Sequence, residues 1–432
     1  MTEEPVVLER PVWRNLVTRV AVDVTPLREF REFRRLWVGQ SISFLGGEVT
    51  FVALPFQVYH LTGSTLALGL FSLTQLVPLL TLTLVGGAIA DAFDRRRMLL
   101  VTETAEALAV AGLAVNAALP HPNLIVVFVL ATVAAACFST GVGAMRSLAA
   151  RLVPPERLVA ATALNSVYYG VGGVVGPALA GVLIKFVGLP GAFALDAASF
   201  AASVAALWRL PSIPPLADVD RPSLRSIVEG FRFVRRQKVI FGFFLVDTNA
   251  MIFGMPLALY PAVADERFGD PTLLGYLYAA PAVGALTASV GSGWMARVGR
   301  QGVAVVVAAS AWGAAIAAFG YATELWLALV LLGLAGAADQ ISAIFRGRMV
   351  LALTPDELRG RLSGIEFMQV ASAPSLGNLE AGVVASLTSL RFSIVSGGIA
   401  CIVGCIAAAL AFPALLRYDS RRHDLEVEAA PA

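Results

Sequence analysis

Long apolar runs alternate with short polar segments along almost the whole chain. Most runs contain about 20 residues, the length at which an α-helix crosses the hydrocarbon core of a bilayer. The pattern predicts membrane-spanning helices, although one closely spaced pair could form a single bent helix. The twelve predicted spans are 36–59, 66–90, 98–119, 124–145, 160–184 and 192–208 in the first half, and 239–262, 273–295, 302–321, 325–344, 362–387 and 392–415 in the second.

Composition places these helices in a membrane rather than in a soluble fold. Hydrophobic residues make up 57% of the 432 residues and charged residues only 14%, and the mean hydropathy is +0.76. Soluble domains carry roughly 25% charged residues, so this chain has too few charges to cover a water-exposed surface. We therefore expect an all-α, multi-pass membrane protein.

The basic residues are sorted to one side of the predicted spans. With the N-terminus inside, only Lys185, Arg267 and Arg391 of the 32 lysines and arginines fall in outer loops. The inner segments hold the rest, including Arg346 in the segment after the tenth span. Cytoplasmic loops are enriched in these residues, so both termini are predicted to be cytoplasmic.

The longest polar stretch, 209–238, separates two groups of six spans. It begins proline-rich and ends basic enough to rest against an anionic leaflet. In the N-terminal arm, phenylalanine alternates with charge over 27–37, which predicts an amphipathic interfacial segment; a solvated arm is the alternative. The expected units are the cytoplasmic arm 1–35, a bundle over 36–208, the cytoplasmic loop 209–238, a bundle over 239–416 and the cytoplasmic tail 417–432.

The two groups of spans share a register of glycines and prolines. At an offset of 201 residues Gly181 aligns with Gly382, and at a local offset of 206 Gly69 aligns with Gly275. Pairs with the same offsets are Pro55/Pro256, Tyr59/Tyr260, Pro154/Pro355, Glu156/Glu357, Gly176/Gly377 and Gly87/Gly293. Parallel six-helix repeats with a site between them describe one class of secondary transporter, so we expect two pseudo-symmetric bundles.

With these repeats, the segment VGGAIADAFDRRRMLL (85–100) resembles a signature of the major facilitator superfamily. That signature, G-x-x-x-D-x-x-G-R-K/R, falls on Gly87, Asp91, Arg95 and Arg96, with Asp94 in place of the usual glycine. The resemblance covers roughly residues 27–417 and implies that Asp91 meets the start of the eleventh span and latches the outward-open state. A positively charged anchor with incidental acids is the alternative.

A second resemblance lies in the fifth span, where GVGGVVGPALAG (170–181) is similar to a motif of exporters in this superfamily. It consists of Gly172, Gly176, Pro177 and Gly181, although Ala180 departs from the usual pattern. An ordinary small-residue packing face is the alternative. Segments 223–237 and 259–293 resemble the branch of drug and metabolite exporters that contains the bacterial enterobactin exporter, which implies export of a drug-like or siderophore-like molecule.

Three acids inside the predicted spans are candidates for proton coupling. Burying a charge at the bilayer centre costs at least ~2.5–3.5 kcal/mol, so such acids are functional candidates by default. They are Glu48, Asp339 and Asp247, and a structural acid bonded to a neighbouring helix is the alternative for each. Neither lysine, Lys185 or Lys238, belongs to a Gly-Lys-Ser/Thr phosphate loop, so ATP is excluded as the energy source and a proton gradient is the simplest one.

Polar and aromatic residues near the middle of the spans are candidates for lining a substrate cavity. They are Gln57, Gln75, Asn165, Tyr168, Asn249, Tyr278, Gln340 and Gln369. Uncompensated acids in such a cavity would suit a cationic amphiphile better than an anionic catecholate siderophore. The cysteines and histidines lack metal-ligand spacing, so we expect no metal and no cofactor.

The sequence thus predicts a secondary active exporter of a small molecule that works by alternating access, with proton antiport. The expected partners are the substrate, protons and membrane lipids, without nucleic acid, and the expected state is a monomer. A passive facilitator or uptake carrier, or a membrane sensor that does not transport, are the alternatives. An enzyme is not expected, because no catalytic constellation is present.

Overall fold

The computed structural model describes residues 23–213 and 224–421, except for the side chains of 84–92, 146, 147, 149, 150 and 224–228. Every regular element in these residues is a helix. The first half contains α2 (Thr25–Glu29), α3 (Arg31–Thr62), α4 (Thr65–Ala92), α5 (Arg95–Ala118), α6 (Leu124–Arg151) and α7 (Leu158–Trp208). The second half contains α8 (Leu224–Arg236), α9 (Lys238–Phe253), α10 (Tyr260–Ala262), α11 (Leu274–Val290), α12 (Gln301–Phe319), α13 (Leu325–Leu353), α14 (Asp356–Leu387), α15 (Leu390–Ala411) and α16 (Pro413–Arg417).

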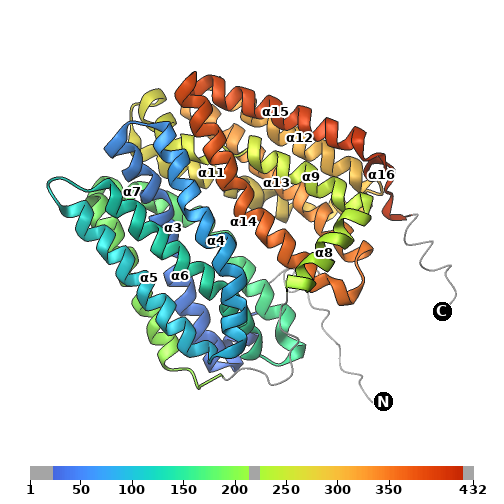
Figure 1. The fold of residues 1–432 in the computed structure, drawn as a ribbon. Helices are drawn as coiled ribbons and strands as arrows, with labels where there is room; N and C mark the ends of the chain where they lie inside the picture. Colours follow the sequence, from blue (N-terminus) through green and yellow to red (C-terminus); the bar gives the residue numbers. More distant parts are fainter. Residues whose placement is uncertain (1–22, 214–223, 422–432) are drawn as a thin grey trace, which may run out of the picture.

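These helices form two bundles, with α3–α7 in one and α9–α15 in the other (Figure 1). Ten described helices are long and apolar enough to cross a membrane. The predicted twelve spans are all present, because α7 contains two of them and α14 contains another that is too polar to count by composition. The predicted twelve-helix, two-bundle fold is therefore confirmed.

The closely spaced pair of spans is the one that forms a bent helix, α7. Its 51 residues run from Leu158 to Trp208, and Gly188 interrupts the helical geometry with φ 69° and ψ 178°. Glycine adopts a positive φ without the steric cost that a side chain would bring. The fifth and sixth spans therefore meet at Gly188 with Pro190 just beyond it, without an intervening loop.

The seventh span is broken, whereas the sequence predicted one helix over 239–262. Helix α9 ends at Phe253, and a 3₁₀ turn at Leu257–Leu259 and the short α10 follow. Pro256 cannot donate a helical hydrogen bond, and other helices bind the exposed backbone groups. Trp312 Nε1 donates to the Gly254 carbonyl at 2.9 Å, and the Ala258 amide donates to Asn378 Oδ1 at 2.9 Å.

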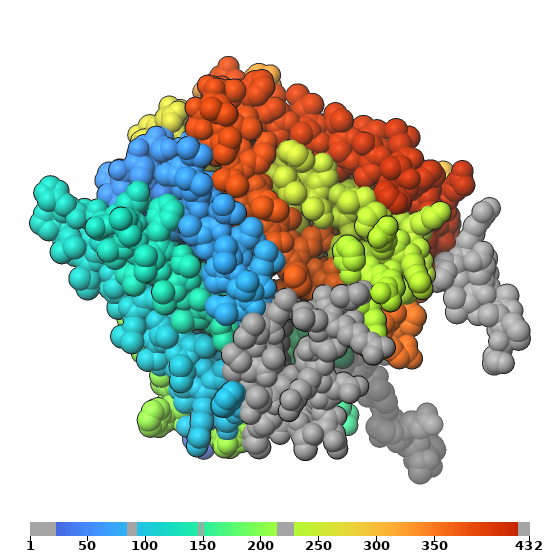
Figure 2. All heavy atoms as spheres, viewed as in Figure 1, coloured from blue at the N-terminus to red at the C-terminus, as the bar shows by residue number. Residues whose placement is uncertain are grey.

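The bundles meet along two pairs of helices, α7 with α11 and α4 with α14. Figure 2 shows the surfaces of α4 and α14 in contact. A Cβ atom added to Gly275 of α11 would lie 2.4 Å from the Pro177 carbonyl oxygen and 3.1 Å from Gly181 Cα of α7. A Cβ atom added to Gly382 of α14 would lie 3.1 Å from Gly69 Cα of α4.

These two crossings are equivalent under the sequence repeat, because Gly181 aligns with Gly382 and Gly275 aligns with Gly69. Both crossings lie near helix ends that the distribution of arginine predicts to be on the outer side of the membrane. The pseudo-symmetry of the bundles is thus visible in the contacts between them, and backbone meets backbone at both crossings.

We predict that Gly275→Ala destabilises the protein by about 1–3 kcal/mol, the usual cost of overpacking. The added methyl group has no space beside the Pro177 carbonyl and Gly181. Thermal unfolding in detergent measures the effect. Gly143→Ala in α6 is the control, because a Cβ atom there meets nothing within 4 Å. Equal melting temperatures for the two variants would contradict the close crossing.

Candidate functional site

A buried ion pair lies in the second bundle, between α9 and α13. Asp247 of α9 pairs with Arg346 of α13, and their side chains are only 3% and 7% exposed. Gln369 of α14 donates from Nε2 to Asp247 Oδ2 at 2.8 Å and to the Phe244 carbonyl at 3.3 Å. Three helices of the second bundle therefore converge on one carboxylate.

A second carboxylate shares the same arginine. Arg346 Nη2 lies 3.8 Å from Asp339 Oδ1, and the Asp339 side chain is 38% exposed, far more than that of Asp247. The two residues are seven positions apart on α13, which places them on the same face two turns apart. The Glu366 carboxylate of α14 is also close enough to attract Arg346. We call Asp247, Asp339, Arg346 and Gln369 the arginine cluster.

The arginine cluster contains three residues that the sequence analysis selected as candidates, Asp247, Asp339 and Gln369. Its fourth residue, Arg346, was predicted to lie in a segment after the tenth span. The tenth span was expected to end at 344, which put Arg346 in a cytoplasmic segment. Helix α13 instead continues to Leu353, and Arg346 is 6% exposed. The spacing of seven residues between Asp339 and Arg346 is the signal that could have indicated a shared face.

Glu48, the third candidate for proton coupling, lies apart from this cluster. It packs on the glycine motif of the fifth span, because a Cβ atom on Gly176 would come 2.3 Å from Glu48 Cβ. Gly172 lies one turn before Gly176 on α7, and its lack of a side chain likewise leaves room for the Phe44 ring. In the described residues Glu48 has neither a hydrogen bond nor an ion pair. Gly172 and Gly176 thus pack α7 on α3, while Pro177 and Gly181 pack it on α11.

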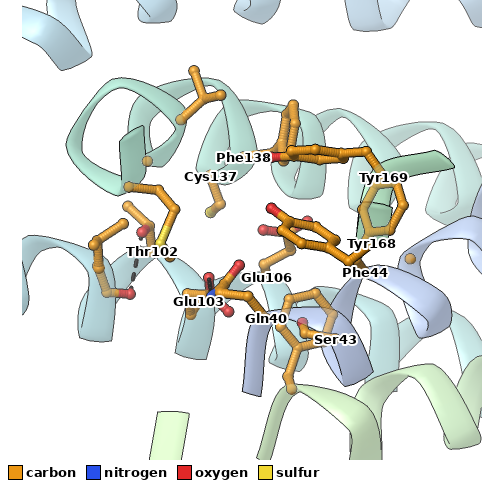
Figure 3. A pocket seen from close by; sticks show the side chains of 16 residues that line it. Gln40, Ser43, Phe44, Thr102, Glu103, Glu106, Cys137, Phe138, Tyr168 and Tyr169 are labelled. Carbon is orange, nitrogen blue, oxygen red and sulfur yellow. Dashed lines mark hydrogen bonds between the residues drawn. The ribbon is translucent and has the colours of Figure 1, made fainter. Parts of the chain in front are cut away.

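A cavity of about 160 Å³ lies inside the first bundle (Figure 3). Its lining includes Glu103 and Glu106 of α5 and the aromatic side chains of Phe44, Phe138 and Tyr168. A neighbouring cavity of about 310 Å³ is lined at one end by Phe33, Trp37 and Thr162, near the starts of α3 and α7. The two cavities share Gln40, Met145, Tyr168 and Tyr169.

The remaining substrate-cavity candidates are distributed over several environments. Asn165 and Tyr168 line the larger cavity. Asn249 instead donates to the Cys401 carbonyl at 2.8 Å, and Tyr278 donates to the Leu257 carbonyl at 3.0 Å. Gln57 is 1% exposed, and the described residues offer its amide no hydrogen-bond partner. Gln75 and Gln340 are partly exposed and line neither cavity.

Asp196 of α7, a further acid inside the first bundle, binds two hydroxyl groups. Thr50 of α3 donates to its Oδ2, and Ser199 donates to its Oδ1 at 3.2 Å. The Asp196 side chain therefore joins the first and sixth spans.

The segment 85–100 is described in part. The side chains of Gly87 and Asp91 lie outside the described residues, so the latch remains a prediction. Asp94 accepts from the Arg97 amide at 3.0 Å as the N-cap of α5, and it also binds Ser212 and the Ile213 amide. Burial raises the pKa of Asp94, but these hydrogen bonds lower it more, so its pKa lies below the ordinary value.

The two arginines of the signature contact the end of α7. Arg96 donates to the carbonyls of Leu207 at 2.9 Å and Trp208 at 2.6 Å. The Arg95 amide donates to the Ile213 carbonyl at 3.3 Å, and its side chain is buried. Cations are favourable beside the free carbonyls of a helix C-terminus, so Arg96 fixes the loop after α4 to the sixth span.

Two pseudo-symmetric six-helix bundles with charged and cavity-lining residues inside them define a multi-pass membrane transporter of the major facilitator class. The family model for transmembrane secretion effectors matches residues 21–425, so the chain belongs to that family.

Curated relatives are enterobactin exporters. The chain is 28% identical over 386 residues to enterobactin exporter EntS of Shigella boydii serotype 18, covering 89% of this chain and 93% of the relative. EntS of Escherichia coli O139:H28 matches with the same identity and coverage. These relatives are transporters rather than enzymes.

Solved structures support the fold. A bacterial homologue of the human lysosomal transporter Spinster, inward-facing and unoccupied, has a TM-score of 0.70 at 14% identity, covering 94% of this chain and 100% of that one. Nucleoside transporter NupG has a TM-score of 0.69 at 14% identity, with coverage of 90% and 99%. A bacterial homologue of the iron transporter ferroportin, inward-facing, has a TM-score of 0.64 at 18% identity, with coverage of 90% and 99%.

We predict that Arg346→Met destabilises the protein by about 3–5 kcal/mol, because it leaves the buried Asp247 carboxylate without its cation. The double variant Arg346→Met/Asp247→Asn should recover most of that loss, since the most deeply buried acid of the cluster is then neutral. Thermal unfolding in detergent measures both. Arg359→Met is the control, because its pair with Asp356 is exposed and contributes only about 0–1 kcal/mol. A double variant as unstable as the single one would contradict the ion pair.

Proposed function

We propose that the protein is a secondary active exporter that moves a small molecule out of the cell by alternating access, in exchange for protons. The observation that carries the proposal is the arginine cluster, in which two carboxylates compete for one buried arginine. The substrate is a drug-like compound or a siderophore-like metabolite, as the kinship with enterobactin exporters suggests. The protein would act in the bacterial inner membrane, with both termini cytoplasmic, as a monomer and without enzymatic activity.

The cluster has the charge balance that proton coupling needs. Asp247 is bonded to Arg346 and Gln369 and its side chain is 3% exposed, whereas the Asp339 side chain is 38% exposed and lies 3.8 Å from Arg346. With Asp339 protonated, Asp247 is the ionised partner in direct contact with Arg346. Loss of that proton brings a second negative charge to Arg346. The electrostatic force between Arg346 and Asp247 of α9 then changes. Such forces are strong in a region of low dielectric.

The break in the seventh span provides the part that moves. Helix α9 carries Asp247 and ends at Phe253, ahead of Gly254 and Pro256. A helix interrupted at a proline can tilt without breaking regular hydrogen bonds further along. A change in the arginine cluster would therefore shift α9 relative to α10 and α11, which lie beside the first bundle.

The contacts between the bundles favour the inward-facing state for this conformation. The glycine crossings and the hydrogen bond from Tyr59 Oη to Glu266 Oε1 at 2.7 Å hold the predicted outer ends together. Two of the structural neighbours are likewise inward-facing. In the outward-facing state, Asp91 would meet the start of α14 and latch the inner ends.

We predict that Asp339→Asn abolishes transport driven by a proton gradient. Proteoliposomes with an imposed pH gradient should accumulate enterobactin or ethidium through the normal protein and stop when an uncoupler is added. The variant should lose at least tenfold in accumulation, because the accessible acid of the cluster can no longer release a proton. Asp356→Asn, an exposed acid of α14, should behave like the normal protein.

Accumulation that survives the uncoupler would overturn proton antiport. Continuous conductance without saturation would instead show a passive channel. Saturable binding without flux would show a sensor.

We also predict that Asp91→Asn lowers transport at least tenfold while leaving expression and the melting temperature unchanged. The substitution keeps the shape of the side chain and removes the charge that would meet the positive end of α14. Transport in the same proteoliposomes checks this, with Glu156→Gln, a surface acid on the same side, as control. Normal rates in Asp91→Asn would exclude the latch.

A further inference from the structure

The described lining of the cavity in the first bundle contains two acidic side chains and no basic one. Glu103 and Glu106 project into it from neighbouring turns of α5, facing Phe138 on one side and Gln40 and Ser43 on the other (Figure 3). Glu103 Oε1 accepts from Gln40 Nε2 at 3.0 Å, while its Oε2 is buried and has no hydrogen-bond partner within the described residues.

Glu106 is the more isolated of the two acids. The described part of the chain gives it no hydrogen bond and no ion pair, and the carboxylates of Glu103 and Asp196 are near enough to repel it. Among the described residues that line the two cavities, none is a lysine, arginine or histidine. Carboxylates that are withdrawn from water without a cation are costly, so these two acids either hold a proton or favour a cation that takes its place.

Aromatic rings form the wall opposite these acids. Phe44 makes edge contacts with Tyr168 and Tyr169, with ring centroids at 5.6 and 5.0 Å. The Tyr168 and Tyr169 rings lie 4.2 Å apart, and Trp37 contacts Tyr168 at 6.1 Å. Ring faces attract cations, and the attraction grows when water is excluded. Acids and ring faces together recognise a positive charge carried on an apolar body.

The cavity has a route of access and enough room for such a molecule. The larger cavity continues it through Gln40, Met145 and Tyr168 toward Phe33 and Trp37, near the start of α3. Together the two spaces have the size that small-molecule sites in proteins require. The predicted cytoplasmic side of the membrane is therefore where a ligand enters.

We propose that this cavity binds a monovalent, aromatic, lipophilic cation, and that such cations are the class of substrate exported. The second half of the proposal rests on the proposed function, whereas the first half concerns binding alone. An anionic or polyphenolic catecholate would meet two carboxylates and no basic group among the described lining residues. The proposed site therefore favours a different class of substrate from enterobactin, for which the curated relatives are named.

The test compares two ions of the same shape and opposite charge. Tetraphenylphosphonium and tetraphenylborate are titrated into the purified full-length protein in detergent, by equilibrium dialysis. Tetraphenylphosphonium should bind saturably and displace ethidium, and tetraphenylborate should bind at least tenfold more weakly. Equal binding of the two ions, or tighter binding of enterobactin than of tetraphenylphosphonium, would overturn the proposal.

Variants locate the site within the chain. Glu106→Gln should weaken tetraphenylphosphonium binding at least tenfold, and Glu103→Gln should weaken it less, because Gln40 already bonds one oxygen of Glu103. Glu106→Asp keeps the charge and should recover most of the affinity. Glu380→Gln on α14 lies outside both cavities and should bind normally. Unchanged binding by Glu106→Gln, in a protein with a normal melting temperature, would refute the site.

Measurements of binding and of transport test the cation site and the export function separately. Charge-selective binding that depends on Glu106, without transport in proteoliposomes, would leave the site intact and overturn the exporter. Proton-driven transport of enterobactin without binding of tetraphenylphosphonium would leave the exporter intact and overturn the cation site.

Discussion

Direct contact between backbones at two glycine crossings is the interaction on which the arrangement of the bundles depends. Lipid provides no hydrophobic force between helices, so membrane helices associate by close packing, which small residues permit. Gly181 with Gly275 and Gly69 with Gly382 occupy equivalent positions in the repeat, so the two crossings form a symmetric pair. In this conformation, such a pair resists separation of the bundles at one end and does not restrain the other end.

The two bundles are related by one sequence repeat, but the charged side chains inside them have different partners. In the second bundle, Arg346 compensates Asp247 and approaches Asp339. In the first bundle, Glu103 and Glu106 face a cavity whose described lining contains no base. In the proposed mechanism the arginine cluster responds to a proton and the acids of the first bundle bind the cation. The duplication would then allow one bundle to carry the coupling and the other to carry the substrate.

The sequence predicted the spans and the repeat because length, hydropathy and glycine register are properties of the chain alone. It failed where neighbouring helices decide the outcome. Pro55 and Pro256 are equivalent in the repeat, yet α3 continues through Pro55 and the seventh span breaks, with Trp312 and Asn378 bonding the freed groups. Arg346 was assigned to a loop because its partner, Asp247, lies on another helix. For the same reason the rotation of α9, which turns Asn249 toward α15, could not be predicted.

Helix α14 connects the proposed coupling site to the bundle interface. It carries Gln369, which bonds Asp247, and Gly382, which contacts Gly69 of the first bundle. Thirteen residues separate these two points, about 20 Å at the 1.5 Å rise of an α-helix. In the proposed mechanism, a displacement of α9 by the arginine cluster would act on α14 at one end, while the glycine crossing restrains it at the other. Pro374 lies between these two points, so α14 would bend or tilt there, and its free end is the end that Asp91 is predicted to meet.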